Sequence, residues 1–110
     1  MGKPLESDWK TFRKRVPKWR ERYLAEQNKR LAALLAEGTN TPTERFWNAE
    51  KEMKAVAWIL VKCLDGHSRS KMEMHLLLMF RHKMIGEEDL EEFSGELRER
   101  ILRVVEAFPV

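Results

Sequence analysis

The chain has 110 residues, 43 % of them hydrophobic and 35 % charged, which is enough for one domain with a hydrophobic core and a heavily solvated exterior. Its net charge of +3 favours solubility but is too small to imply nucleic-acid binding by itself. The single cysteine, Cys63, excludes an internal disulfide and favours a reducing compartment. No apolar run approaches the ~18 residues of a membrane span and the first residues lack a secretory signal, so we expect a cytoplasmic protein.

The first thirty residues combine positive charge with a helical pattern. Ten basic and four acidic side chains give them a charge of +6, whereas the other eighty residues carry −3. Apolar residues recur there every three or four positions, which predicts a helix with one apolar face: Trp9, Phe12, Val16, Trp19 and Tyr23. Pro17 interrupts this pattern without changing its phase, so we expect two nearly continuous helices that end at Gly38. Residues 1–6 are expected to form a flexible N-terminus.

A second helix is predicted over Thr43–Leu64. Thr41 and Glu44 have the spacing of a capping box, and Pro42 suits the first helical turn, where its missing N–H costs nothing. Two apolar faces follow, one formed by Phe46, Met53, Ala57, Leu60 and Leu64 and the other by Trp47, Trp58 and Val61. Because Ala55–Val61 is apolar almost all round, we expect this helix to be central and buried.

Two further helices complete the predicted fold. A methionine-rich helix begins at Ser70, which pairs with Glu73 as a capping box, or at Ser68, and it ends at Ile85–Gly86. The last helix begins with the acidic residues 87–89 and carries an apolar stripe from Leu90 to Phe108. We therefore expect an all-α protein, an irregular array or bundle of four to five helices forming a single domain over residues 1–110.

The strongest candidate binding feature is a row of basic residues on the first helix. Lys10, Lys14, Lys18 and Arg22 are spaced four apart, on the face opposite the aromatics. Such a row could bind phosphates or an acidic partner, or it could simply be a solvated face. The aromatics belong more naturally to the core than to a base-stacking surface, so the basic row alone is the candidate.

Two other segments are candidates for binding. Arg69 and Lys71 flank a helix start, where free amides attract anions, although the helix that follows is too apolar for a DNA-recognition helix. On the methionine-rich helix, some apolar residues point away from the expected core side and could contact a protein partner: Met74, Leu77, Leu78 and Ile85.

No pattern predicts a catalytic, cofactor or metal site. Cys63 and His67 are separated by the Asp65–Gly66 turn, and His75 and His82 lie too far apart along a helix to share an ion. The acidic run after Gly86 has the character of a helix start rather than of a carboxylate pair with separated pKa values. We therefore identify no cofactor and no small-molecule substrate.

The expected function is that of a small, non-enzymatic interaction or regulatory protein, binding a protein partner or a second copy of itself. The positive N-terminal segment and the acidic Glu87–Glu99 stretch could attract each other between copies or within one chain. The alternative is a nucleic-acid-binding accessory protein that uses the basic row, and an enzyme of unknown class is third.

Overall fold

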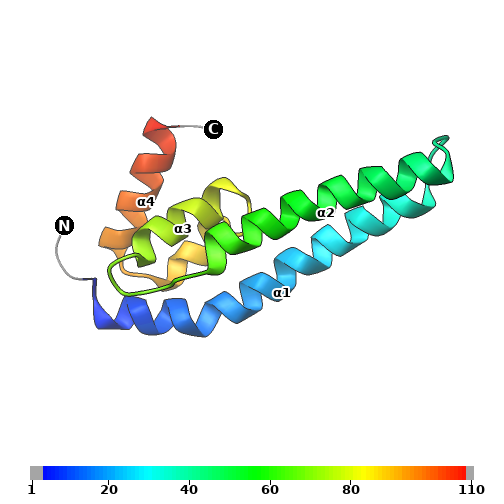
Figure 1. Cartoon of the computed structure of the whole chain (residues 1–110). Helices are drawn as coiled ribbons and strands as arrows, with labels where there is room; N and C mark the ends of the chain where they lie inside the picture. Colours follow the sequence, from blue (N-terminus) through cyan, green and yellow to red (C-terminus); the bar gives the residue numbers. More distant parts are fainter. Residues whose placement is uncertain (1–3, 109–110) are drawn as a thin grey trace.

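The computed structural model describes residues 4–108, which form five helices and no strand (Figure 1). The helices are α1 (Glu6–Ala36), α2 (Pro42–Leu64), α3 (Met72–Arg81), the short 3-10 helix η1 (Glu87–Glu92) and α4 (Gly95–Ala107). The predicted all-α fold is therefore confirmed. Of the N-terminus expected to be flexible, residues 1–3 lie outside the described part of the chain, and α1 begins at Glu6.

The long helices α1 and α2 lie side by side as a hairpin, and the shorter helices pack at one end of it (Figure 1). We call that end, formed by α3, η1, α4 and the first half of α1, the body, and we call the projecting part of α1 and α2 the arm. The molecule is elongated, with extents of 54 × 27 × 21 Å. In the described part of the chain, no helix combines the length and apolarity needed to cross a bilayer.

The turn between α1 and α2 contains the predicted glycine and the predicted helix cap. Gly38 has a φ of +103°, in the left-handed region that glycine adopts without strain. The Thr41 hydroxyl accepts a hydrogen bond from the Glu44 amide at 3.1 Å, and a Glu44 carboxylate oxygen accepts one from the Thr41 amide at 3.2 Å. This confirms the capping box, with Pro42 as the first helical residue.

Helix α1 continues through Pro17 instead of dividing there as expected. Pro17 lies on the exposed side of the helix, where water can serve the carbonyl group that loses its helical hydrogen bond. On the opposite side the aromatic stripe packs without interruption into the core, with Trp9 only 8 % and Trp19 only 3 % exposed. This packing confirms that the aromatics belong to the core and holds one helix together across the proline.

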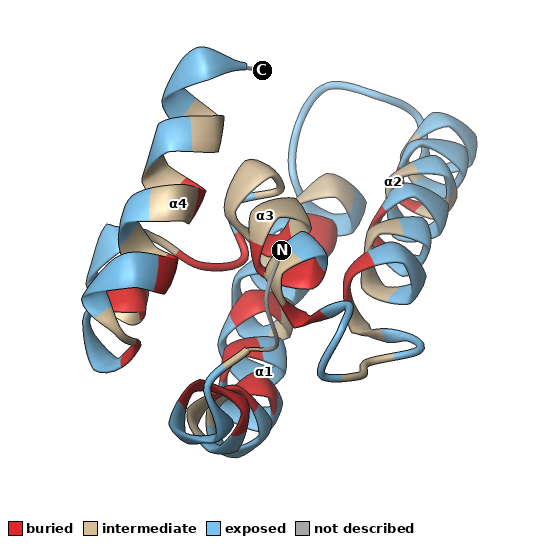
Figure 2. Cartoon of the chain, turned by 90° about the vertical axis from the view of Figure 1, so that its left-hand side faces the viewer, coloured by how far each residue is buried: buried red, intermediate tan, exposed pale blue. Residues whose placement is uncertain are grey.

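The core lies in the body and is centred on α3, not on α2 (Figure 2). Its most deeply buried side chains come from α1, α2, α3, the following loop, η1 and α4: Phe12, Cys63, Met72, Leu76, Met79, Met84, Leu90, Leu97 and Ile101. The prediction of a central, buried second helix is wrong, because α2 buries only a narrow stripe, Ala49, Val56 and Cys63. Much of its apolar surface has no neighbouring helix.

The C-terminal segments also differ from the prediction. Helix α3 begins at Met72 without a side-chain cap; Ser68 accepts a hydrogen bond from the Lys71 amide at 3.3 Å, in the turn that precedes the helix. It ends at Arg81, four residues early, because the amides of Met84 and Ile85 turn back to the Met79 carbonyl. The expected last helix is divided into η1 and α4.

The division occurs at Ser94, whose hydroxyl caps α4 by accepting a hydrogen bond from the Leu97 amide at 3.3 Å. The carboxylate of Asp8, only 4 % exposed, accepts hydrogen bonds from the Ser94 amide at 2.8 Å and from its hydroxyl at 2.7 Å. This contact joins the start of α1 to the start of α4 across 86 positions of sequence, which is why the local apolar pattern did not indicate the break.

Candidate interaction surface

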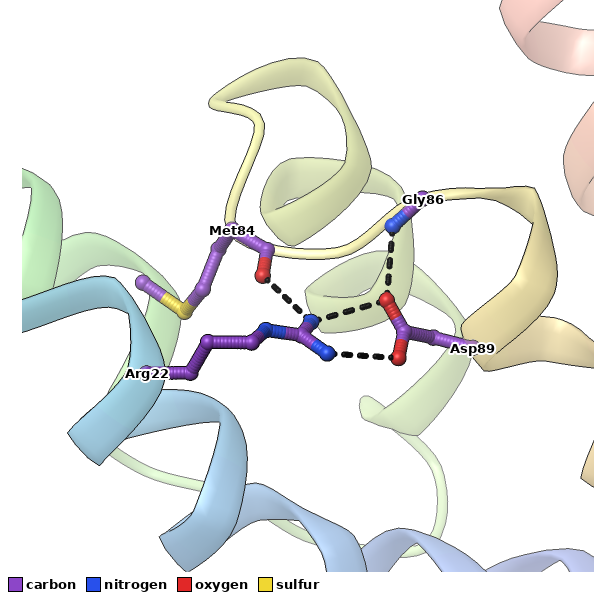
Figure 3. Close-up of polar contacts among 4 residues, drawn as sticks. All are labelled: Arg22, Met84, Gly86 and Asp89. Atoms are coloured by element: carbon purple, nitrogen blue, oxygen red, sulfur yellow. Dashed lines mark hydrogen bonds and ion pairs between the residues drawn. The ribbon is translucent and has the colours of Figure 1, made fainter. Parts of the chain in front are cut away.

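The basic row on α1 is divided by the fold. Lys10, Lys14 and Lys18 are exposed on the side of α1 that faces solvent, and among the described residues none of these three takes part in an ion pair. Arg22 instead reaches η1, where its guanidinium donates to both carboxylate oxygens of Asp89, at 2.8 and 3.0 Å (Figure 3). The row that could meet a phosphate backbone therefore consists of three lysines.

Arg22 and Asp89 form a small polar network at the junction of α1 and η1 (Figure 3). The Met84 carbonyl accepts a third hydrogen bond from Arg22 at 3.1 Å, and the Gly86 amide donates to Asp89 at 2.8 Å. Burial alone would raise the pKa of Asp89, but the hydrogen bonds from Arg22 and Gly86 and the charge of Arg22 outweigh it and lower the pKa. Arg22 thus stabilises the fold.

A second ion pair crosses the same junction. Arg15 lies 2.7 Å from Glu92 of η1. Together with Arg22–Asp89, this pair shows that attraction between the basic N-terminal segment and the acidic stretch is satisfied within one chain. Charge attraction of this kind is consequently a weak basis for self-association.

The predicted anion site before α3 is also partly neutralised. Arg69 forms a two-pronged ion pair with Glu6, at 2.7 and 3.0 Å, and its guanidinium lies over the ring of Trp9 at 5.4 Å. Lys71 is exposed and lies next to the start of α3. The fold uses Arg69 to hold the start of α1 against the turn between α2 and α3.

The apolar candidates on and after α3 are largely covered. Ile85 is buried, and Leu77 and Leu78 are half-buried against the core. Only Met74 is exposed, at 49 %. These four residues therefore do not form one open surface.

His67, His75 and Cys63 make their contacts at the turn between α2 and α3. Both ring nitrogens of the buried His75 lie 3.0 Å from backbone oxygens, those of Lys71 and Asp65. Burial lowers the pKa of His67, whose ring donates to the Cys63 carbonyl at 2.8 Å, and burial raises the pKa of the Cys63 thiol, which opposes its use as a nucleophile. Within the described ranges, no three His, Cys, Asp or Glu side chains gather as a metal site.

Five of the nine large hydrophobic side chains that are exposed in the described part of the chain lie on α2, where the sequence predicts burial. We call the surface that they form the α2 outer face, and its five large side chains are 55–61 % exposed: Phe46, Trp47, Met53, Trp58 and Val61. An α-helix has ~3.6 residues per turn, so these five residues lie beside and opposite the buried stripe of α2, which consists of Ala49, Val56 and Cys63. The sequence signal was divided between the two predicted apolar faces, since Phe46 and Met53 belong to the first and the other three residues to the second, and both faces were expected to be buried.

Polar groups lie among and beside the apolar side chains of the α2 outer face. Lys54 pairs with Glu50 at 2.9 Å, and the Lys62 ammonium lies 4.8 Å from the ring centre of Trp58. Phe46 and Trp47 contact each other edge to face, with ring centres 5.0 Å apart. The face combines aromatic anchors with charged side chains nearby, which is typical of protein interfaces.

Comparisons with family models, with curated proteins and with solved structures found no match for this chain.

Proposed function

We propose that this chain is a small, non-enzymatic interaction protein that uses the α2 outer face to bind an amphipathic helix of a protein partner. The observation that carries the proposal is the presence of five large apolar side chains, each more than half exposed, on a single helix. Scattered exposed apolar residues are normal on a monomer, but several large ones gathered along one helix are characteristic of interaction sites.

A helical partner fits the shape of the arm. The arm is a layer of only two helices, each packed against the other along one side (Figure 1). Apolar residues on α2 recur at helical spacing along the unpaired side, so another helix could lie along them as in a bundle. The continuous helix α1 links the arm to the body and would present this face in a fixed orientation.

A photo-crosslinking amino acid in place of Trp58 tests this function in cells. We expect a discrete adduct from position 58 and none from position 108, because Phe108 is also aromatic and is 66 % exposed but lies directly after α4, away from the α2 outer face. Equal adducts from both positions, or none from position 58, would refute the proposal. A cytoplasmic location forms part of the proposal, since the free thiol of Cys63 suits a reducing compartment.

A second candidate function, nucleic-acid binding, is supported by the three lysines of the basic row, which are exposed on α1. Lys10, Lys14 and Lys18 form a row along one side of the helix, and phosphate contacts would relieve their mutual repulsion. Binding to mixed-sequence DNA and RNA should then weaken steeply with salt, and Lys14→Gln with Lys18→Gln should reduce the salt slope by about two. No binding at low salt would exclude this function.

A further inference from the structure

We infer that the partner of the α2 outer face is a second copy of this chain, with the two α2 helices packed antiparallel about a two-fold axis near Met53 and Lys54. The two arms would then form a row of four helices, with the two α2 helices in the middle and one body at each end. This inference rests on the proposed function, since it names the partner of the same face.

The exposed area is close to what a stable dimer needs. An aromatic side chain buries about 150–250 Å² when fully covered, so the exposed fractions leave roughly 500 Å² of side-chain surface on the five residues of each copy. Complete coverage of these residues in both copies would remove about 1,000 Å² from water, which is the lower limit for a specific interface, and contacts between flanking residues would add to this.

A two-fold arrangement also suits the position of this face on the molecule. In a two-fold dimer the same surface is used by both copies, so a single apolar stripe along one helix can pair with itself. The midpoint of α2 lies near Met53, between Phe46 and Trp47 toward the tip of the arm and Trp58 and Val61 toward the body. Antiparallel packing would therefore place the aromatics near the tip of one arm against the apolar residues near the base of the other.

Charge favours the antiparallel orientation over the parallel one. Along the border of the α2 outer face, Glu44 lies near the start of α2 and Lys62 near its end. Antiparallel packing brings Glu44 of each copy toward Lys62 of the other, and it also aligns the helix dipoles favourably. Parallel packing would oppose like charges and bring both bodies to the same end (Figure 1).

Sedimentation of the purified chain tests the inference. We expect a concentration-dependent dimer, and we expect Trp58→Glu to weaken association at least about tenfold, as for the loss of one central interface residue. The matched control Phe108→Glu introduces the same charge in place of another exposed aromatic and should leave association unchanged. A monomer at every concentration, or equal losses from both variants, would overturn the inference.

Cysteine crosslinking tests the orientation. A disulfide between two copies should form in Lys54→Cys, which lies at the axis, but not in Thr43→Cys, because the antiparallel dimer separates the two copies of residue 43 by roughly 30 Å. Crosslinking of both variants would indicate parallel packing and overturn the proposed arrangement. The native Cys63 is fully buried and should contribute no crosslink.

The mass of the adduct formed from position 58 in cells separates this inference from the proposed function. Twice the mass of the chain supports the second copy. A discrete adduct with a different protein, together with a monomer in sedimentation, overturns self-association but leaves the α2 outer face as an interaction surface. With no discrete adduct and no dimer, both proposals fail.

Discussion

Replacing Asp89 with Asn should destabilise the fold by about 1.5–2 kcal/mol, since hydrogen bonds to a charged group contribute about 1.5–3 kcal/mol. Asp89 is mostly buried, its side chain 13 % exposed, and it accepts two hydrogen bonds from Arg22 and one from Gly86. An amide offers one acceptor oxygen, and its NH₂ group would face the guanidinium. The lower end of the range applies because the Arg22 side chain is itself 52 % exposed and partly screened by water.

The stability that Asp89 contributes also depends on pH. The pKa of Asp89 is lower in the folded chain than its ordinary value near 4, so its ion pair stabilises the fold above that pH and is lost as the pH falls through the folded pKa. Urea unfolding followed by circular dichroism should therefore show a steeper acid loss of stability for the wild type than for Asp89→Asn. This difference should be absent at neutral pH, where only the constant loss remains.

A matched control is available at the same junction. Glu92 pairs with Arg15 at 2.7 Å, but its side chain is 49 % exposed, so Glu92→Gln should cost less than about 1 kcal/mol. Equal losses from the two variants would refute the distinction between a partly buried pair and an exposed one. If the stability of Asp89→Asn falls with decreasing pH as steeply as that of the wild type, the assigned direction of the pKa shift of Asp89 is refuted.

Two further substitutions test contacts that set the ends of helices. Asp8→Ala should lower the free energy of unfolding by about 2–4 kcal/mol, because it removes two hydrogen bonds from Ser94 to a buried carboxylate; a double-mutant cycle with Ser94→Ala checks that the two losses are not additive. Thr41→Ala removes the capping box at the tip of the arm and should lower the free energy of unfolding by about 1 kcal/mol, as measured by thermal unfolding. An unchanged melting temperature would show that the cap does not stabilise the fold.

Local patterns in the sequence predicted that the chain is helical and where α2 is capped, but not that α1 continues through Pro17 or that the expected last helix divides at Ser94. The spacing of Trp9, Phe12 and Val16 predicts both the helix and the face that enters the core, because side chains three and four apart share one side of a helix. The Thr41–Glu44 cap was also predictable, since both hydrogen bonds join residues only three apart. The break at Ser94 depends on Asp8, and no local pattern indicates a contact across 86 positions.

The position of α2 could not be predicted for a different physical reason. Ala55–Val61 is apolar almost all round, and such a helix is stable either inside a core or with one side left for a partner. Hydrophobicity alone does not show whether the rest of the chain can cover both sides. Here the aromatics of α1 and the methionines of α3 cover each other in the body, which leaves the side of α2 that faces away from α1 without a neighbouring helix.

The separate behaviour of Arg22 and the three lysines of the basic row also depends on neighbours that are distant in the sequence. Sequence spacing placed Arg22 in one row with three lysines, although its long side chain can reach sideways to an acid on another element. A guanidinium matches a carboxylate in two-pronged geometry, whereas an ammonium acts as a point charge, so the arginine was the member best suited to an internal pair. In a row of mixed basic residues near an acidic segment, the lysines are therefore the stronger candidates for an external ligand.

The contacts that stabilise the fold lie apart from the proposed interaction face. The ion pairs Arg15–Glu92 and Arg22–Asp89 join α1 to η1, and the Asp8–Ser94 contact joins α1 to the start of α4. None of them involves the α2 outer face, so a partner could occupy that face without breaking them. Substitutions at Trp58 should accordingly change association while leaving the unfolding of the monomer nearly unchanged, whereas substitutions at Asp8 or Asp89 should do the reverse.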